Sequence, residues 1–117
     1  MNFLQVIKDK FVDPTGKKRS SQWSAVRKEH LRLNPVCYCC GSKSKLQVHH
    51  ISPFHLTPEL ELEPSNLITL CVNKTLNCHL ILGHRKSFKK ENPNVIQDCD
   101  YIAYMLDDIN DKQHKKN

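Results

Sequence analysis

Residues 46–84 read LQVHHISPFHLTPELELEPSNLITLCVNKTLNCHLILGH, and this stretch decides how the chain folds. Within it, the adjacent histidines His49 and His50 follow a short apolar segment that contains Leu46 and Val48. Neighbouring side chains on a strand point to opposite faces, so one imidazole can face a metal ion while the other faces something else. Few structural demands explain such a pair, whereas a metal-assisted hydrolase explains it well.

The next part of the stretch predicts a long loop and a second strand. Residues 52–66 contain three prolines and three glutamates, and a loop of this length in a small domain is usually functional or irregular by design. His55 lies in this loop and is more simply an exposed side chain than a substrate contact. The apolar residues 67–70 then predict a short strand.

A helix is expected from His79 to about residue 90. On a straight helix, His79 and His84 would project about 140° apart, because they are five residues apart and a turn has 3.6 residues. Gly83 would have to end or distort the helix for both imidazoles to reach one ion. The local backbone around Gly83 therefore decides whether both imidazoles can bind one ion.

Four of the six cysteines offer two pairs of thiols for a structural zinc ion. The first pair has CxxC spacing, in which a tight turn lets both sulfurs reach one ion, and Gly41 follows with the freedom to take a positive φ. Six residues separate the second pair, so the intervening loop must bulge outward. We favour a four-cysteine zinc site over unrelated buried thiols, the alternative that remains because cysteine is common in cores. The ligands would be Cys37, Cys40, Cys71 and Cys78, with Cys39 as a bystander.

The charge is distributed unevenly along the 117 residues, a length that suits one domain with a modest core. The net charge is +6: residues 1–45 carry ten Lys or Arg and three acids (+7), and the remainder carries eight and nine (−1). A basic N-terminal part favours a polyanionic partner, nucleic acid first. A solvated basic surface is the plainer alternative.

Two helices are expected before the first cysteine. Apolar residues at helical spacing predict a short amphipathic helix over residues 3–12. A second helix places Trp23 and His30 on one face and ends before Pro35. Trp23 is more simply a core residue there, and His30 is more simply a satisfied core histidine than a metal ligand.

A third helix is expected after Pro93. Its apolar stripe runs through residues 95–109 and includes Cys99, which is most simply a core residue. The stripe either packs on the core or pairs two copies of the chain. The tail from Asp111 is expected to fray.

The N-terminal segment MNFLQVIKDKF lacks the apolar core of a signal peptide, and no apolar run has the length of a membrane span. We therefore expect a cytoplasmic protein whose thiols stay reduced. In such a protein the cysteines bind metal more often than they form disulfides.

Taken in order, these motifs make the chain resemble the HNH endonuclease family over roughly residues 20–95. The resemblance implies an α+β fold with a small ββα-metal core, two short antiparallel strands, flanking N-terminal and C-terminal helices and a structural zinc. It divides the single domain 1–117 into a basic helical part (1–35), a zinc knuckle with the ββα-metal core (36–90) and a C-terminal helix (93–110). The matching motifs are Cys37-x-x-Cys40, Val48-His49-His50-Ile51, Asn66-Leu67, Leu70-Cys71, Cys78-His79 and the upstream helix from Trp23 to Asn34-Pro35.

The resemblance also implies roles for individual residues. His50 matches the general base that activates water, and His49 matches a ligand of the catalytic divalent ion. Asn66 matches the residue that braces the loop and so orients the base. His79 would be a second metal ligand and His84 the candidate for a third. The wide spacing of the second cysteine pair, with the Gly83-His84 ending, leaves open which of these two histidines binds more directly and whether both do.

The implied activity is hydrolysis of DNA phosphodiester bonds with one divalent cation (Mn²⁺, Mg²⁺, Ni²⁺, Co²⁺ or Zn²⁺), by nicking or by double-strand cutting, with low sequence specificity. Two rivals are a non-catalytic zinc-ribbon module that binds nucleic acid and an interaction protein that recruits a partner through its C-terminal helix. Besides DNA, the expected partners are a second copy of the chain through that helix and, by family analogy alone, phage packaging proteins. The DNA backbone would be held by Lys17, Lys18, Arg19, Arg27 and Arg32.

Overall fold

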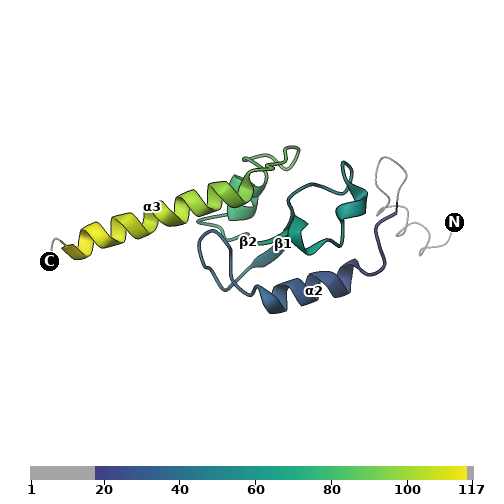
Figure 1. Ribbon diagram of the computed structural model, residues 1–117, viewed down its shortest axis with the longest axis horizontal. Helices are drawn as coiled ribbons and strands as arrows, with labels where there is room; N and C mark the ends of the chain where they lie inside the picture. Colours follow the sequence, from purple (N-terminus) through teal and green to yellow (C-terminus); the bar gives the residue numbers. More distant parts are fainter. Residues whose placement is uncertain (1–17, 116–117) are drawn as a thin grey trace.

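The computed structural model describes residues 18–115 and has the α+β architecture that the sequence predicted (Figure 1). The helix expected over residues 3–12 and the basic residue Lys17 lie outside the described residues. The described elements are, in order, α2 (Trp23–Leu33), β1 (Leu46–His50), the 3₁₀ turns η1 (Pro58–Leu60) and η2 (Pro64–Asn66), β2 (Leu67–Cys71), the π-helical turn η3 (His79–Gly83) and α3 (Val95–Lys115). None of the described helices could span a membrane.

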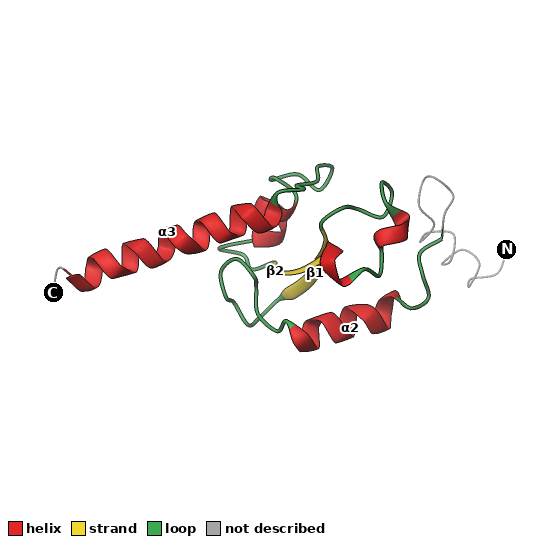
Figure 2. Ribbon diagram, in the orientation of Figure 1, coloured by secondary structure: helices red, strands yellow, loops and turns green. Residues whose placement is uncertain are grey.

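The two strands form an antiparallel pair at the centre of the molecule (Figure 2). In the register, Leu46 lies opposite Cys71 and His50 lies opposite Leu67. All five residues of β2 are buried, whereas burial varies along β1, where His49 is the most deeply buried residue. Both strands contact α2 and η3. This arrangement gives the two neighbouring histidines of β1 different surroundings.

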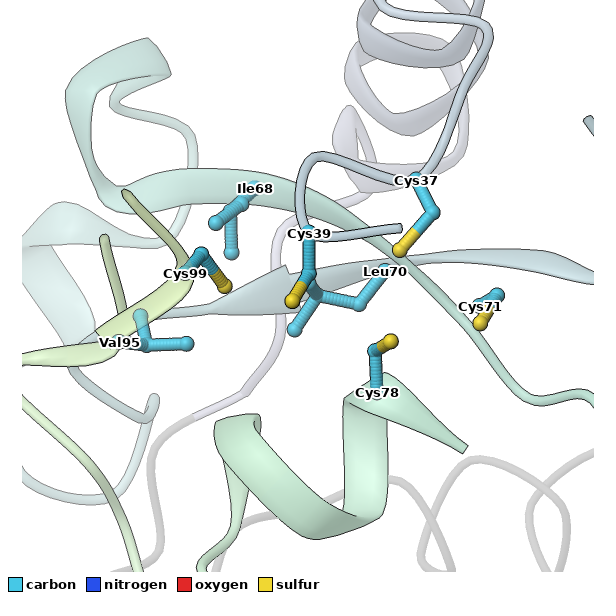
Figure 3. Close-up of a cluster of buried hydrophobic side chains, with 8 residues drawn as sticks. All are labelled: Cys37, Cys39, Ile68, Leu70, Cys71, Cys78, Val95 and Cys99. Carbon is cyan, nitrogen blue, oxygen red and sulfur yellow. The ribbon is translucent and has the colours of Figure 1, made fainter. Parts of the chain in front are cut away.

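The core is small and rich in sulfur. Five of its eight buried residues are cysteines, which pack with aliphatic side chains of β2 and α3 (Figure 3). Cys99 is a core residue, as the sequence predicted, and Cys39, which was predicted to be a bystander of the CxxC pair, is buried beside it. The hydrogen bond between their thiols, together with burial, raises the pKa of Cys39. A core of this size needs further support, because a small domain buries little apolar surface. The cluster consists of Cys37, Cys39, Ile68, Leu70, Cys71, Cys78, Val95 and Cys99.

The helix expected from His79 to about residue 90 is much shorter in the structure. It is a single π-helical turn that ends at Gly83. Beyond it, Arg85 and Lys86 adopt left-handed backbone conformations, with φ of 50° and 73°. Left-handed residues cannot continue a right-handed helix, so the prediction of a longer helix was wrong.

The C-terminal helix is longer than expected, because α3 continues to Lys115 and includes residues that were predicted to fray. Asn92 fixes its start: the Asn92 side chain accepts a hydrogen bond from the Asn94 backbone N–H (3.0 Å) and donates to the carbonyl of Leu82 (2.9 Å). Val95 is buried against the core. The C-terminal half of α3 extends away from the other elements (Figure 1).

The expectation for His30 was wrong in one respect. It lies half-buried on α2, which has no fully buried side chain, and its Nε2 is shielded from water without a hydrogen-bond partner in the described part of the chain. Burial lowers the pKa of His30 accordingly. It is therefore not a satisfied core histidine.

Candidate metal centre

Three imidazoles converge beside the end of β1. His49 comes from the strand, whereas His79 and His84 come from η3 and the residue that follows it. The Nε2 atom of His79 lies 3.1 Å from Nδ1 of His49 and 3.1 Å from Nε2 of His84. One ring nitrogen from each residue lies within 4.8 Å of the others, so the three can hold a metal ion. They line a pocket of about 300 Å³ together with Arg19 and His50.

In His79 and His84, one ring nitrogen carries the proton, and the unprotonated nitrogens of the two rings face each other. Nδ1 of His84 lies 2.9 Å from the carbonyl oxygen of Lys90, which can only accept a hydrogen bond, so this nitrogen carries the proton. Nδ1 of His79 likewise donates to Oε1 of Gln47 at 2.9 Å. The Nε2 lone pairs of both rings therefore point into a 3.1 Å gap, where they repel unless a cation lies between them.

This donor set fits a divalent metal ion. Metal–nitrogen bonds of about 2.0–2.1 Å in tetrahedral geometry would separate two ligand nitrogens by roughly 3.3 Å, close to the observed spacing. Histidine ligands usually donate their second nitrogen to a carbonyl or amide oxygen, and His79 and His84 both do so. Burial and the neighbouring imidazoles lower the pKa of His49 to about 3 and that of His79 to about 4. Both are therefore neutral near pH 7, the form that binds metal.

The π-helical turn explains how two histidines five residues apart can share a site. In a π-helix the backbone hydrogen bonds join residues i and i+5, so His79 and His84 lie on the same side of the turn. Gly83 lets this turn approach β1: a Cβ there would lie 3.2 Å from Leu70 and 3.3 Å from the ring of His49. The glycine therefore favours this close packing, and the predicted 140° separation applies only to an α-helix.

His50 has different neighbours from His49. Its Nε2 lies 2.9 Å from the carbonyl oxygen of Glu61, to which it donates, so Nδ1 retains its lone pair. Its ring packs against Trp23 of α2, with centroids 4.4 Å apart. Burial lowers the pKa of His50, and the charge of Arg19 lowers it further, against the opposing effect of the Glu61 carbonyl. Trp23 was expected to be plain core, but it is half-exposed and covers this imidazole.

Asn66 ties together the two ends of the loop between the strands. Its buried side chain accepts a hydrogen bond from the backbone N–H of Ser52 (2.8 Å) and donates to the carbonyls of Ser52 (3.0 Å) and Leu60 (3.2 Å). Leu60 immediately precedes Glu61, whose carbonyl holds His50. Asn66 therefore fixes the segment that orients the imidazole.

Glu61 also anchors the N-terminal segment to the site. Its carboxylate is buried and accepts hydrogen bonds from the guanidinium of Arg19 and from the backbone N–H of Ser20 (2.7 Å). The guanidinium lies over the ring of Phe54, 4.6 Å from its centroid. Of the other predicted DNA contacts, Lys18 and Arg27 are exposed, and Arg32 forms an exposed ion pair with Glu29 on the same helix.

The four cysteines predicted to bind zinc form a second cluster. Their sulfurs all lie within 4.8 Å of one another, and those of Cys40 and Cys71 are 3.6 Å apart. Zinc–sulfur bonds of about 2.3 Å would separate the sulfurs of a tetrahedral site by roughly 3.8 Å. Gly41 takes the expected positive φ of 77° at the tight turn. The cluster Cys37, Cys40, Cys71 and Cys78 therefore fits a structural metal ion.

The surroundings of Cys71 favour its thiolate. Burial raises the pKa of the Cys71 thiol, but the backbone N–H groups of Cys78 and Asn73 outweigh that effect and lower it to about 7. Burial raises the pKa of Cys40 to about 11 and that of Cys78 higher still. Metal binding at this cluster must therefore release protons.

The comparison with protein families agrees with this geometry. The model of the HNH endonuclease family matches residues 37–85, a segment that includes both clusters, His50 and Asn66. The match covers 49 of the 117 residues of the chain, so this segment resembles the HNH endonuclease family. No curated protein and no solved structure matches the chain. The HNH domain indicates a nuclease-type or nucleic-acid-binding function, and HNH nucleases act on DNA with divalent cations.

Several residues that contact the site were not predicted from the sequence. Gln47 lies two residues before His49, so strand alternation could have placed it on the same face of β1. Glu61 gave no comparable signal, because one of three glutamates in a long loop does not stand out. Trp23 lies upstream of the HNH domain, and its helical stripe indicated only a buried face.

Proposed function

We propose that this protein is an HNH endonuclease that hydrolyses DNA phosphodiester bonds, with one divalent cation held by three imidazoles and with His50 as general base. The observation that carries the proposal is the difference between two neighbouring residues of β1. Nδ1 of His49 lies 3.1 Å from Nε2 of His79. In contrast, Nε2 of His50 donates a hydrogen bond to the carbonyl of Glu61, and its Nδ1 stays unprotonated. A protein that only binds nucleic acid needs neither arrangement.

His49, His79 and His84 would hold the catalytic cation. When bound, a divalent cation supplies electrostatic stabilisation of the negative charge that develops on the phosphate and on the leaving oxygen. Imidazole ligands favour Mn²⁺, Ni²⁺, Co²⁺ or Zn²⁺ over Mg²⁺, which prefers oxygen ligands. Gln47 and the carbonyl of Lys90 keep the ligand nitrogens of His79 and His84 unprotonated.

His50 would take a proton from water through Nδ1. The water oxygen forms a bond to phosphorus, the bond from phosphorus to the 3′-oxygen breaks, and the proton resides on His50. The lowered pKa keeps this imidazole neutral near pH 7, as a base requires. The Glu61 carbonyl fixes its protonated nitrogen, and Trp23 restricts the ring from the other side. Asn66 acts indirectly, by fixing the loop that carries Glu61.

DNA would be held chiefly through its phosphates. Arg19 borders the pocket, and Lys18 and Arg27 are exposed on the same N-terminal part of the chain. Contacts to phosphate carry no sequence information, so we expect low sequence specificity and binding that weakens steeply with salt. Lys17 stays part of this prediction.

The cysteine cluster would bind a structural zinc ion. It joins the knuckle at residues 37–40 to the end of β2 and to the start of η3, so the ion would stabilise the element that carries His79. Reduced thiols suit the cytoplasm that we expect for this protein.

The oligomeric state determines whether one strand or both are cut, because each copy has one proposed site. A homodimer through α3 remains a prediction, supported by the exposed apolar side chains Tyr101, Met105 and Ile109. A partnership with phage packaging proteins remains a prediction from family analogy alone.

A nicking assay on supercoiled plasmid with added Mn²⁺ tests the proposed function. We expect His50→Ala to abolish cutting while DNA binding and zinc content are unchanged. His30→Ala is the matched control, because this histidine lies on α2 outside the pocket, and it should cut like the wild type. Cutting by His50→Ala at the wild-type rate would overturn the assigned base. Absence of cutting by the wild type with every candidate metal would favour the zinc-ribbon alternative.

A further inference from the structure

The loop that follows the last imidazole of the pocket carries a concentration of positive charge. Residues 85–90 read RKSFKK, so four of six side chains are cationic. All four are exposed, and the ion pairs found among the described residues, Arg19–Glu61 and Arg32–Glu29, do not involve them. This second basic cluster lies outside the basic N-terminal part that the sequence singled out.

Hydrogen bonds fix this loop to the proposed metal centre. The backbone N–H of Lys86 donates to the carbonyl of Leu80 (2.9 Å), and that of Ser87 donates to the carbonyl of His84 (3.0 Å). At the far end, the carbonyl of Lys90 accepts from Nδ1 of His84. The loop therefore begins at the proposed ligand and returns to it, which fixes the position of its backbone relative to His84.

The backbone of the loop is strained. Arg85 and Lys86 are consecutive residues with positive φ, and neither is glycine. Such conformations are uncommon for residues with a Cβ, and they cluster at functional sites where the surrounding structure holds them. Here the two residues turn the chain immediately after His84, and the carbonyl of Lys90 returns to the His84 ring.

Phe88 lies at the centre of the loop with its ring exposed at the metal centre. The side chain is 63% exposed, and its ring centroid lies 4.9 Å from that of His84 and 5.8 Å from that of His79. A ring that served only to shield the imidazoles would itself be buried. An exposed aromatic face among cations is the combination that proteins use to bind single-stranded nucleic acid, in which bases stack on the ring and cations follow the backbone.

We propose that residues 85–90 form a nucleic-acid-binding loop in which Phe88 stacks on an unpaired base next to the scissile phosphate, so that the protein prefers single-stranded or locally unpaired DNA. This inference rests on the proposed function, because it names the substrate class of the same site. Arg19 and His50 line one part of the pocket, and the loop contacts two other lining residues, His79 and His84, through Phe88. One strand can therefore contact both as it crosses the three imidazoles.

The test measures binding rather than cutting. The full-length protein, without added divalent metal, is titrated into a single-stranded oligonucleotide that contains the fluorescent base 2-aminopurine, and into the matching duplex. We expect single strands to bind more tightly and the fluorescence to be quenched by stacking. Phe88→Leu, which keeps an apolar side chain over His84, should weaken single-strand binding roughly tenfold and remove the quenching. Phe88→Trp should restore both.

Tyr104→Leu is the matched control, because Tyr104 is an equally exposed aromatic residue (68%) on α3 and should be replaceable without effect. Thermal unfolding confirms that each variant folds. The proposal would be overturned if Phe88→Leu bound single strands and quenched the fluorescence as the wild type does. It would also be overturned if the substitution lowered the affinity for single strands and for duplex equally. The binding test does not depend on cutting. If His50→Ala still nicked DNA, the assigned base would be refuted, but the binding result for Phe88 would be unaffected.

Discussion

Gly83→Ala tests whether the close approach of η3 to β1 builds the metal centre. The added methyl group would lie 3.2 Å from Leu70 Cδ1 and 3.3 Å from the His49 ring, whereas carbon atoms prefer separations of about 3.5–4.0 Å. Leu70 is fully buried in the paired strand β2 and has little room to move. The His49 ring therefore has to shift by a few tenths of an ångström.

The effect should be larger on metal binding than on folding. Overpacking costs about 1–3 kcal/mol, and the loss of glycine's freedom in the unfolded chain offsets about 0.4–1 kcal/mol of that. We therefore expect the metal-free variant to lose about 1 kcal/mol of unfolding free energy. Displacement of a metal ligand should lower affinity about 10- to 100-fold, as the loss of a residue that orients a ligand does. That change removes about 1.4–2.7 kcal/mol of metal-dependent stabilisation at saturating metal.

Mn²⁺ titration calorimetry and urea unfolding with and without Mn²⁺ measure the two effects separately. Gly41→Ala is the matched control, because Gly41 has a φ of 77° and no atom within 4 Å of an added Cβ. Its cost should be backbone strain of about 1–2 kcal/mol, with Mn²⁺ affinity unchanged. Wild-type Mn²⁺ affinity in Gly83→Ala would refute the inference that this glycine positions His49.

Three further predictions follow from the two clusters. Without added metal, folding stability should fall as the pH drops from about 6.5 toward 4. The imidazoles gain protons in this range in the unfolded chain, whereas folded His49 (pKa about 3) and His79 (pKa about 4) stay neutral. Urea unfolding at pH 7 and pH 5 checks the sign of this change, and equal stability at the two pH values would contradict it. Gln47→Leu should lower Mn²⁺ affinity about 10- to 100-fold with little change in stability, since Gln47 is exposed and holds His79; calorimetry that finds wild-type affinity would remove Gln47 from the site. Cys37→Ser should lose zinc and fold poorly, whereas Cys39→Ser should retain zinc by elemental analysis; retained zinc in the first variant would refute the four-cysteine site.

The strands and the alternation of the two histidines were predictable because they depend on local periodicity. A strand sends consecutive side chains to opposite faces whatever the rest of the molecule does, so His49 and His50 were expected to differ before any contact was known. The cysteine pairs were similarly predictable, because few other arrangements explain CxxC spacing followed by a second pair. The resemblance to HNH endonucleases rested on this order of motifs, and the family match over residues 37–85 agrees with it.

Features that depend on tertiary contacts were not predictable. The apolar stripe of α2 indicated that Trp23 lies on the inward face of the helix. It could not indicate that the side chain packed against Trp23 is the imidazole of His50. The carbonyl of Glu61 is likewise invisible to a pattern of side chains, since every residue has one. The same holds for Lys90, whose carbonyl orients His84 while its side chain suggests only a solvated charge.

The π-helical turn shows how a conflict in the sequence can indicate function. Two histidines five residues apart fit one metal ion poorly on an α-helix, and a glycine precedes the second of them. The structure resolves the conflict with the rarer π-helix, whose hydrogen bonds join residues i and i+5, and it places Gly83 where an added Cβ would lie only 3.2–3.3 Å from Leu70 and the His49 ring. The strained residues Arg85 and Lys86 then follow directly, so two of the three non-glycine residues with positive φ in the described part of the chain lie next to the π-helical turn, the third being Lys45. Because such departures cost free energy and persist only where other interactions hold them, their concentration beside His84 is itself an argument that this segment, rather than the regular α3, contacts the substrate.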